Sequence, residues 1–418
     1  MKKNYIKTEQ EESSWQHATQ ITSGIRFLRV LLASCLITIT TGCADTTSDS
    51  DTETATTERV STGETATTAA DDTAKTTGTD AMAIIGRIEP TGSAPAWGKN
   101  ITDPMLLVIE KLTELQTGPP LHQLSPMQAR KAPTPADAVK ALLQEHNAPM
   151  PPARVDTTGK KVPVEKGSIH ARIYTPANAT ASNPGIVYYH GGGWVIAGID
   201  TYDASARALA EQTGAVVVAV AYRQAPEHKF PTAHNDAFAA YKWVVDNAAS
   251  LKINPDKIAV AGESAGGNLA ANVSIMARDN NVKMPVHQLL VYPIAGYDMN
   301  TASYQEHAQA KPLSKAGMAW FFDKYLRNTK DGMDQRIALV NVPNLRNLPP
   351  ATVINAEIDP LRTGGVLYAD KLKEAGVAVK AQVYDGVTHE FFGMAAVLPQ
   401  AKEAQALATA ELNKAFGK

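Results

Sequence analysis

The sequence predicts an α/β protein with a mostly parallel sheet that is covered by helices. Three observations support this class. From about residue 168 onward, short β-branched segments alternate with helical segments. The chain has 418 residues, of which 44% are hydrophobic, which is enough for one large core. A Gly-x-Ser-x-Gly motif lies between one strand segment and the helical segment that follows it.

Seven segments that are rich in β-branched and aromatic residues have the length of buried strands. They are 169–174, 186–189, 215–221, 257–261, 287–292, 352–355 and 380–384. Helical periodicity is found between and after them, at 204–212, 233–247, 267–278, 361–374 and 400–415. This alternation favours a parallel or mixed sheet, because each crossover helix packs on a face of the sheet.

Two further segments do not fit the alternation and predict a helical cap. Apolar residues recur at helical spacing over 105–115 and 136–145, and several prolines separate these stretches. We therefore expect N-terminal cap helices within 81–158, followed by a sheet-containing domain over 159–418. An insert at about 296–330 carries large apolar side chains, and these are candidates for lining a pocket, although packing within the cap explains them at least as well: Met318, Trp320 and Phe321.

The N-terminal segment predicts export. An apolar run at Val30–Thr41 follows two arginines, is too short to span a membrane and ends near Cys43. The pattern over 1–43 resembles a bacterial lipoprotein signal in which Cys43 becomes lipidated. Cys35 fits the local pattern better, but it leaves almost no apolar core before the cleavage point. An ordinary cleaved signal or a short uncleaved anchor is the alternative.

Residues 44–80 predict a disordered tether. The segment is rich in Thr, Asp, Ala and Ser and has hardly any large apolar side chain. It cannot bury enough surface to offset the entropy of ordering. Together with lipidation, this predicts an exported cell-envelope lipoprotein whose folded domain is held near a membrane, on the periplasmic side or at the cell surface.

Ser264 is the candidate nucleophile. It lies in Gly262-Glu263-Ser264-Ala265-Gly266, after the strand segment 257–261 and before a helical segment. Flanking glycines allow a sharp turn that lifts the hydroxyl out of the sheet. The N-terminus of the next helix directs positive potential towards the oxygen. The context predicts nucleophilic catalysis, and a Gly/Ser turn without chemical consequence is the alternative.

A run of three glycines predicts an oxyanion hole. The sequence His190-Gly191-Gly192-Gly193-Trp194 follows the strand segment 186–189. Glycine lets backbone N–H groups approach a ligand closely. We assign the amides of Gly191, Gly192 and Ala265 as donors to the oxyanion, with Gly193 giving clearance. His190 is expected to hold the loop by a hydrogen bond, and Trp194 is expected to pack in the interior.

His389 is the candidate base, and Asp359 is the candidate for orienting it. Each follows a strand segment, so both are expected at the carboxyl edge of the sheet, where Ser264 is also expected. The order Ser, Asp, His matches hydrolases that have a Gly-x-Ser-x-Gly turn. Glu357 competes with Asp359, but Pro360 makes a tight turn that fixes the position of Asp359.

Four other histidines were considered as the base and are expected to have surface or structural roles. One falls in a loop, one in a helix, one at the start of a strand and one in the cap insert; they are His228, His234, His287 and His307.

On these motifs the chain resembles the hormone-sensitive lipase family of bacterial esterases and lipases. The resemblance runs from about Gly159 to the C-terminus, and its carriers are 190–194, 222–228, 262–269, 359–361 and 386–389. It implies the α/β-hydrolase fold with a helical cap. It also implies ester hydrolysis through an acyl-enzyme, with Ser264, Asp359 and His389 as the catalytic triad. The implied oxyanion donors are Gly191, Gly192 and Ala265.

Two positions depart from the family pattern. Glu263 stands where the family commonly has Asp, so its longer side chain could reach different partners. Thr363 follows Arg362 where an acidic residue is more usual. Neither position is part of the predicted triad.

The expected substrate is a small acyl ester, and we expect neither a metal nor a cofactor. A hydrolase of another acyl bond, such as an amide or an acetylated sugar, is the nearest alternative. A ligand-binding protein on the same fold is less favoured, because all three candidate catalytic residues are present. A structural surface lipoprotein would leave them unexplained. The net charge of -2 argues against a nucleic-acid partner, which would favour a basic face.

Overall fold

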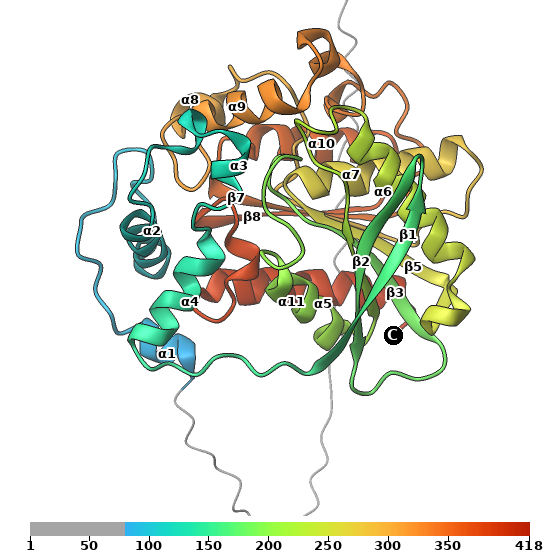
Figure 1. Cartoon of the computed structure of the whole chain (residues 1–418), viewed down its shortest axis with the longest axis horizontal. Coiled ribbons are helices and arrows are strands. Elements are labelled where there is room, and N and C mark those ends of the chain that lie inside the picture. The colour runs from blue at the N-terminus through green and yellow to red at the C-terminus, as the bar shows by residue number, and fades with distance from the viewer. Residues whose placement is uncertain (1–79) are drawn as a thin grey trace, which may run out of the picture. The chain divides into compact units, whose positions relative to one another are not determined.

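A computed structural model describes residues 80–418, which contain one eight-stranded sheet with helices on both faces (Figure 1). The predicted signal over 1–43, with Cys43, lies outside the described residues. So does the predicted tether, apart from its last residue. Both therefore stay predictions. In the part of the chain that is described, no helix has both the length and the hydropathy needed to cross a membrane.

The sheet is mostly parallel, as predicted, and its strand order is β1-β2-β4-β3-β5-β6-β7-β8. Antiparallel pairing is confined to one end, where β1 pairs with β2 and β2 pairs with β4. The other neighbours are parallel. The strands are β1 (Val155–Val164), β2 (Gly167–Pro176), β3 (Asn183–Tyr189), β4 (Val216–Ala221), β5 (Ile253–Glu263), β6 (Gln288–Val291), β7 (Ala351–Ile358) and β8 (Val379–Thr388).

The seven predicted strand segments correspond to β2–β8, and β1 is the strand that the prediction omits. Most residues of β1 are exposed, and Val162 is its one buried side chain. An edge strand with so little apolar character gives almost no sequence signal. The predicted boundary between residues 158 and 159 falls within β1, which pairs with β2 over its whole length.

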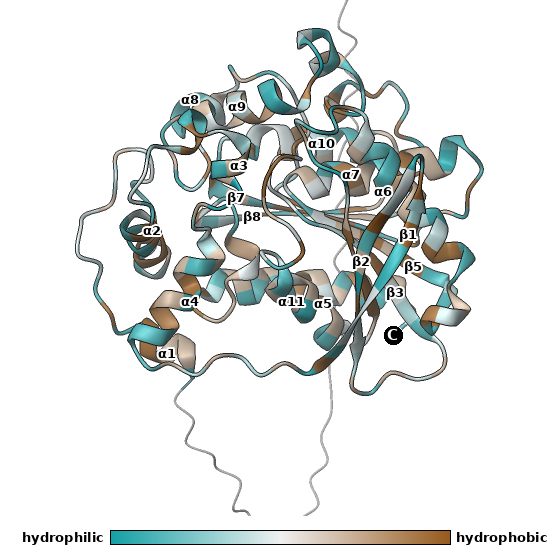
Figure 2. Cartoon of the chain, viewed as in Figure 1, coloured by the Kyte–Doolittle hydropathy of each residue, from teal (hydrophilic) through white to brown (hydrophobic). Residues whose placement is uncertain are grey.

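Helices cover the two faces of the sheet. On one face lie α5 (Asp203–Thr213) and α11 (Pro399–Ala415), and on the other lie α6 (Thr232–Asp246), α7 (Ala265–Asp279) and α10 (Arg362–Glu374) (Figure 1). Neighbouring strand residues point to opposite cores, so Val187 packs with the α6–α7 side and Ile186 with the α5–α11 side. The central strands β3 and β4 are therefore buried along almost their whole length, whereas the edge strand β1 is mostly hydrophilic, as its teal stretches illustrate (Figure 2).

The segments predicted as a cap are helical. The N-terminal segment contains α1 (Ala81–Ile85), α2 (Asp103–Leu115), η1 (Leu121–Gln123), α3 (Pro126–Ala129) and α4 (Pro135–Glu145). The segment between β6 and β7 contains α8 (Ala302–Glu306), α9 (Lys315–Tyr325), η3 (Thr329–Met333) and η4 (Leu339–Asn341). The two segments meet where the Trp320 indole N–H donates to the Leu124 carbonyl, with 3.1 Å between the atoms. The remaining short helices are η2 (Ala249–Leu251) and η5 (Phe391–Gly393).

Candidate active site

Ser264 occupies a strained turn between β5 and α7. Its φ of 57° lies in the left-handed region, which a residue with a side chain rarely adopts. The turn needs its glycines: a Cβ on Gly266 would lie 1.9 Å from the Tyr189 carbonyl oxygen, and a Cβ on Gly262 would lie 2.2 Å from that of Gly266. The tight packing fixes the hydroxyl at the N-terminus of α7, the positive end of the helix dipole.

The structure brings Ser264, His389 and Asp359 together. The Nε2 atom of His389 lies 2.9 Å from the Ser264 Oγ atom. The Nδ1–H group of His389 donates to Oδ2 of Asp359 over 2.7 Å, and Oδ1 of Asp359 accepts the Leu361 N–H. All three triad side chains are buried. The three residues come from the turns after β5, β7 and β8, at the edge of the sheet that the strand order predicts.

The competing carboxylate has different partners. Glu357 accepts the backbone N–H of Gly386 at 2.7 Å and the side-chain amide of Asn100 at 3.0 Å. It therefore ties the C-terminal part of β8 to the segment before α2. Asp359, and not Glu357, is the residue that holds the imidazole.

The rival histidines also lie elsewhere. His234 contacts Tyr325 and Asn268, His287 contacts Thr352, and His307 bonds to the backbone of Trp97. His228 is exposed. These four have the surface or structural positions that we expected.

The surroundings of His389 favour its protonated form. Burial alone would lower the pKa of the imidazole, but the negative charge of Asp359 and its hydrogen bond raise it. Glu390 and Glu263 act in the same direction. The balance raises the pKa of His389 above its ordinary value. An imidazole in such a site is a stronger base, which suits the removal of a proton from a hydroxyl group.

The glycine loop borders the cavity through two of its three glycines. Gly192 and Gly193 line the cavity that contains Ser264 and His389, whereas Gly191 is not part of the lining. A Cβ on Gly191 would lie 2.2 Å from the Tyr202 hydroxyl, so Gly191 packs closely against Tyr202. Both Gly192 and Gly193 have positive φ, 91° and 58°. Ala265 is the first residue of α7, where backbone N–H groups have no partner within the helix.

The flanking residues of this loop have the roles expected of them. His190 donates through Nδ1 to the Gly191 carbonyl at 2.8 Å, and its ring stacks on Tyr222. Trp194 is fully buried and stacks on Tyr325, with ring centroids 4.5 Å apart. These contacts fix the loop from both ends.

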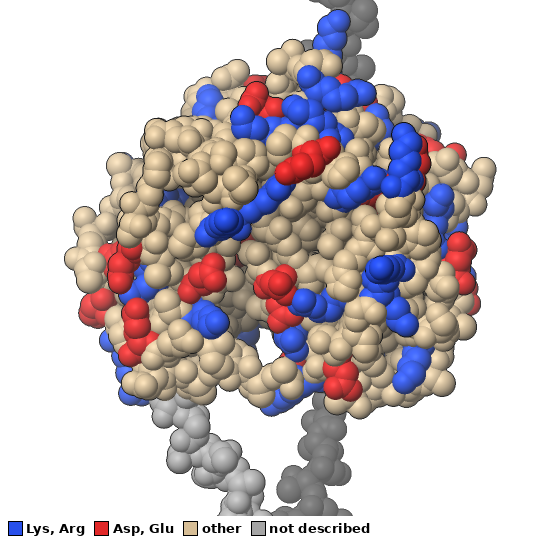
Figure 3. Space-filling model, viewed as in Figure 1, with Lys and Arg blue, Asp and Glu red and all other residues tan. Residues whose placement is uncertain are grey.

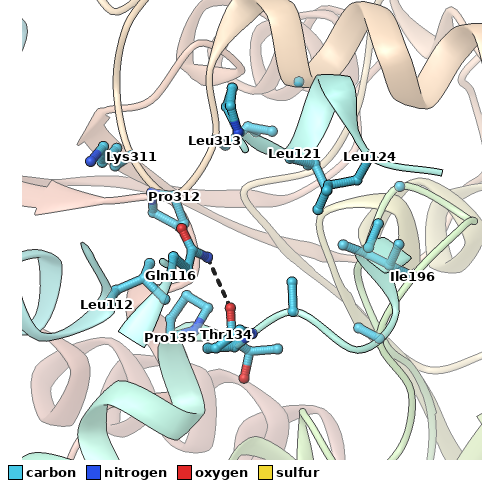
Figure 4. A pocket seen from close by; sticks show the side chains of 18 of the residues that line it. Leu112, Gln116, Leu121, Leu124, Thr134, Pro135, Ile196, Lys311, Pro312 and Leu313 are labelled. Atoms are coloured by element: carbon cyan, nitrogen blue, oxygen red, sulfur yellow. Dashed lines mark hydrogen bonds between the residues drawn. The ribbon is translucent and has the colours of Figure 1, made fainter. Parts of the chain in front are cut away.

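A cavity of about 460 Å³ opens over Ser264 and His389. Its volume is typical of small-molecule sites. The N-terminal segment and the insert contribute Leu112, Leu121, Leu124 and Leu313 to its apolar wall, shown in Figure 4, and the loop after β3 contributes Ile196. Met318 and Phe321 also line the cavity, whereas Trp320 is buried in the cap and does not. Of the three candidate residues in the insert, two therefore line the cavity and one packs within the cap.

Two glutamates lie beside the triad. Glu263 is buried and accepts hydrogen bonds from the hydroxyls of Tyr188 and Tyr292. Burial, and then the nearby charge of Glu390, raise the pKa of Glu263 to about 7. The longer side chain at this position therefore reaches two tyrosines. Sequence reasoning missed Glu390, although its place directly after the candidate base was a usable signal.

Among the described residues, no group of three or more His, Cys, Asp and Glu side chains is arranged to hold a metal ion. On the face drawn in Figure 3, basic side chains gather in the upper part with a few acidic ones among them, and uncharged surface lies between most of the other charged side chains.

Comparison with known proteins agrees with this geometry. A family model described as alpha/beta hydrolase fold matches residues 186–393. The carboxylesterase NlhH of Mycobacterium tuberculosis is 41% identical over 252 residues, which is 59% of this chain and 79% of that protein. The ethyl acetate hydrolase of Pseudomonas putida is 35% identical over 239 residues, 56% of this chain and 75% of that protein.

The fold of this chain is also similar to that of a solved esterase structure. The hyperthermophilic esterase from the archaeon Pyrobaculum calidifontis superposes with a TM-score of 0.66 and 38% identity. The match covers 73% of this chain and 96% of that one. The fold and the similarity together define an α/β-hydrolase. The chain belongs to the hormone-sensitive-lipase-like family of that superfamily, and it is a carboxylic-ester hydrolase.

Proposed function

We propose that Ser264, His389 and Asp359 are the catalytic triad of this ester hydrolase. The observation that carries the proposal is a continuous path of two hydrogen bonds, 2.9 Å from Ser264 to His389 and 2.7 Å from His389 to Asp359. These groups come from three separate turns and converge beside the N-terminus of α7. A serine is activated when a base accepts its proton and a third group orients that base, and these three side chains are arranged in this way.

In the first half of the reaction, Nε2 of His389 takes the proton of the Ser264 hydroxyl while Oγ forms a bond to the ester carbonyl carbon. The resulting tetrahedral oxyanion collapses, the bond to the alkoxy oxygen breaks, and Nε2 returns the proton to that oxygen. The products of this half are the alcohol and an acyl-enzyme on Ser264. In the second half, water takes the place of Ser264 as the nucleophile, and the carboxylic acid is released.

Asp359 and the backbone amides support different charges in this scheme. Asp359 holds the Nδ1–H tautomer of His389 and stabilises the imidazolium. We assign the oxyanion to the amides of Gly192, Gly193 and Ala265, with Gly193 replacing the Gly191 that the sequence suggested. This choice is supported by the cavity lining, which includes Gly192 and Gly193. A single donor of this kind contributes roughly 3–4 kcal/mol to transition-state stabilisation.

The cavity supports a substrate with a short or medium acyl chain. Its apolar wall suits hydrocarbon, but a volume of about 460 Å³ is that of a small-molecule site. A series of p-nitrophenyl esters from acetate to palmitate should give maximal kcat/KM at the short to medium lengths. Matched p-nitroanilides should be far poorer substrates. A maximum at palmitate, or equal turnover of the anilides, would contradict this assignment.

The nucleophile is tested with Ser264→Ala. We expect kcat for p-nitrophenyl acetate to fall by at least about 10⁴-fold, as it does when a serine nucleophile is removed elsewhere. Ser274→Ala is the matched control: Ser274 is a buried serine in the same helix, and its hydroxyl donates to the Ala270 carbonyl. The control should keep its turnover. Turnover of Ser264→Ala within tenfold of the unmodified enzyme would refute the assignment.

The anchoring of the chain is a separate proposal that rests on the sequence. We propose export through the signal over 1–43, lipidation of Cys43, and a location in the cell envelope with residues 44–80 as the tether. Metabolic labelling with a radioactive fatty acid should mark the full-length protein but not Cys43→Ala. Sensitivity of processing to globomycin is the second readout. A mature protein without label would end this proposal and leave the triad untouched.

A further inference from the structure

Glu390 lies on the wall of the catalytic cavity, next to the reacting side of His389. Its Oε1 atom is 3.9 Å from Nε2 of His389, the atom that also faces Ser264. Asp359 is bonded to the opposite nitrogen, Nδ1. The imidazole therefore has a carboxylate near each of its two nitrogens, and only the one at Nδ1 belongs to the triad.

This position of Glu390 is costly to the fold. Its φ of 74° lies in the left-handed region, where glycine would be unstrained. Its side chain is only 19% exposed, so most of the hydration of the carboxylate is lost. A second carboxylate, Glu263, lies so close that the charge of Glu390 raises the pKa of Glu263. Strain and buried charge that persist at an active site point to a role there.

The contacts indicate which of the two glutamates carries the negative charge. The Tyr202 hydroxyl donates to Oε1 of Glu390 over 2.5 Å, and such a bond favours the ionised form. Burial, the largest influence, and the charge of Asp359 raise the pKa of Glu390 above its ordinary value, and the charge of His389 and the Tyr202 bond reduce that rise. Glu263 is buried to 1% exposure, and its pKa of about 7 leaves it protonated on the acid side of neutrality. Glu390 is the better site for the charge.

We propose that Glu390 is a positioning residue whose carboxylate, held by Tyr202, stabilises the protonated imidazole of His389 from the Nε2 side. The inference rests on the proposed role of His389 as the base. When Nε2 takes the Ser264 proton, the imidazolium gains a negative neighbour on each side. When Nε2 returns the proton to the alkoxy oxygen, the ion pair with Glu390 is lost again. Glu390 itself exchanges no proton in either step.

Other groups also face His389 and contribute to its titration. Asp359 comes from the turn after β7, Glu263 from the end of β5, and Tyr292 from the end of β6, where its ring centroid lies 4.5 Å from that of His389. Tyr202 precedes α5, and Tyr188 is on β3. His190 lies nearby, with its ring centroid 6.1 Å from that of Tyr202, and burial lowers its pKa to about 4, so it is uncharged at neutral pH.

The test is the pH profile of kcat/KM for p-nitrophenyl acetate in two variants, Glu390→Gln and Glu390→Gly. Both variants remove the charge of Glu390. Gln keeps an acceptor for the Tyr202 hydroxyl, and Gly suits the left-handed backbone, so we expect at least one of the two variants to fold. We expect the acid limb to move to lower pH by about one unit, the lower end of the effect of an opposite charge at such a distance. The plateau in kcat should fall by roughly three- to tenfold, because a weaker base remains, and KM should stay within twofold.

Glu374→Gln is the matched control. Glu374 is exposed on α10, so the substitution makes the same change of charge far from the cavity. Its profile should superpose on that of the unmodified enzyme. An acid limb that stays in place in both folded Glu390 variants, or one that moves to higher pH, would overturn the proposal. Full turnover in Ser264→Ala would instead refute the nucleophile, so the two failures are distinguishable.

Discussion

The carboxyl edge of the sheet and the cap form opposite walls of one cavity, but they are built differently. At the sheet edge, backbone contacts fix each group: Ser264 sits at a φ of 57°, and Gly266 leaves no room for a Cβ. On the cap side, apolar side chains such as Leu121 and Leu124 are only partly buried. The edge therefore sets the geometry of the reacting atoms, whereas the cap sets the shape of the space around them.

Polar contacts join the cap segments to the rest of the domain, among them the bond from Asn100 to Glu357. The Arg130 guanidinium, next to α3, donates to the carbonyls of Val195 and Ala225 at 2.8 and 2.7 Å and pairs with Glu227. We infer that substitutions at the edge act mainly on kcat, and that those in the cap act mainly on KM and on the choice of acyl chain. A transition state depends on sub-ångström placement of charge, whereas an apolar wall contributes in proportion to buried area.

The largest effect is expected at Asp359. Asp359→Asn keeps the shape of the side chain but no longer fixes the Nδ1–H tautomer, and kcat should fall by about 10⁴-fold. Glu357→Gln is the control, because Glu357 bonds to Gly386 and Asn100 and does not contact His389. Steady-state kinetics with p-nitrophenyl acetate measures both. A loss below tenfold for Asp359→Asn would remove Asp359 from the triad.

The next effect is expected at the glycine loop. A Cβ on Gly193 would lie 2.2 Å from Cδ1 of Phe321, and the φ of 58° is strained for alanine. Gly193→Ala should displace the loop and its amide donor, so that kcat falls by about 100-fold or more. Gly198→Ala, five residues along, meets no atom within 4 Å and should stay within twofold. Equal activity of the two variants would argue against Gly193 as a donor.

The pH dependence should follow the protonation of His389. Its pKa is raised, so the base binds a proton at higher pH than an ordinary histidine does. The acid limb of kcat/KM should therefore have its midpoint above about 6.5, and activity should fall about tenfold for each unit below it. Stopped-flow or initial-rate measurements between pH 5 and 9 (about the range in which such enzymes stay folded) test this. A rate that is flat down to pH 5 would contradict it.

The smallest effect is expected in the cap. Leu121→Ala removes apolar area from a partly exposed wall. The lost contact with the acyl chain should weaken substrate binding by about 1 kcal/mol and raise KM roughly fivefold. The change should appear with esters whose acyl chain reaches the wall and be absent with acetate. The series of p-nitrophenyl esters of different acyl-chain length measures KM in the unmodified enzyme and in Leu121→Ala. A fall in kcat for acetate of more than tenfold would mean that the cap also fixes the reacting groups.

The sequence predicted the sheet edge better than it predicted the cap wall. Strands β2–β8 have β-branched runs, and the residues of the triad follow strands directly, so their convergence could be inferred from strand order. The strand β1 has too few buried residues to give a pattern, and α1 has only five residues. Which insert side chains line the cavity depends on contacts distant in sequence, as the separation of Met318 from Trp320 illustrates.

Two details of the site also needed the structure. Three successive glycines look alike in sequence, and only the structure indicates that Gly192 and Gly193 border the cavity while Gly191 packs against Tyr202. The contact of Glu390 with His389 depends on a left-handed backbone angle, which a Glu residue does not suggest. Glu263 was noted as unusual, but its two tyrosine partners come from β3 and from the turn after β6.

The most direct test of the account is covalent labelling of the nucleophile. A fluorophosphonate should react with the folded enzyme, and tryptic digestion should place the added mass on the peptide Ile258–Arg278, with fragmentation assigning it to Ser264. Ser264→Ala should take up no label on this peptide, and Ser274→Ala should be labelled normally. Label on any other residue of the active enzyme, or none at all, would contradict the central claim that Ser264 is the activated serine.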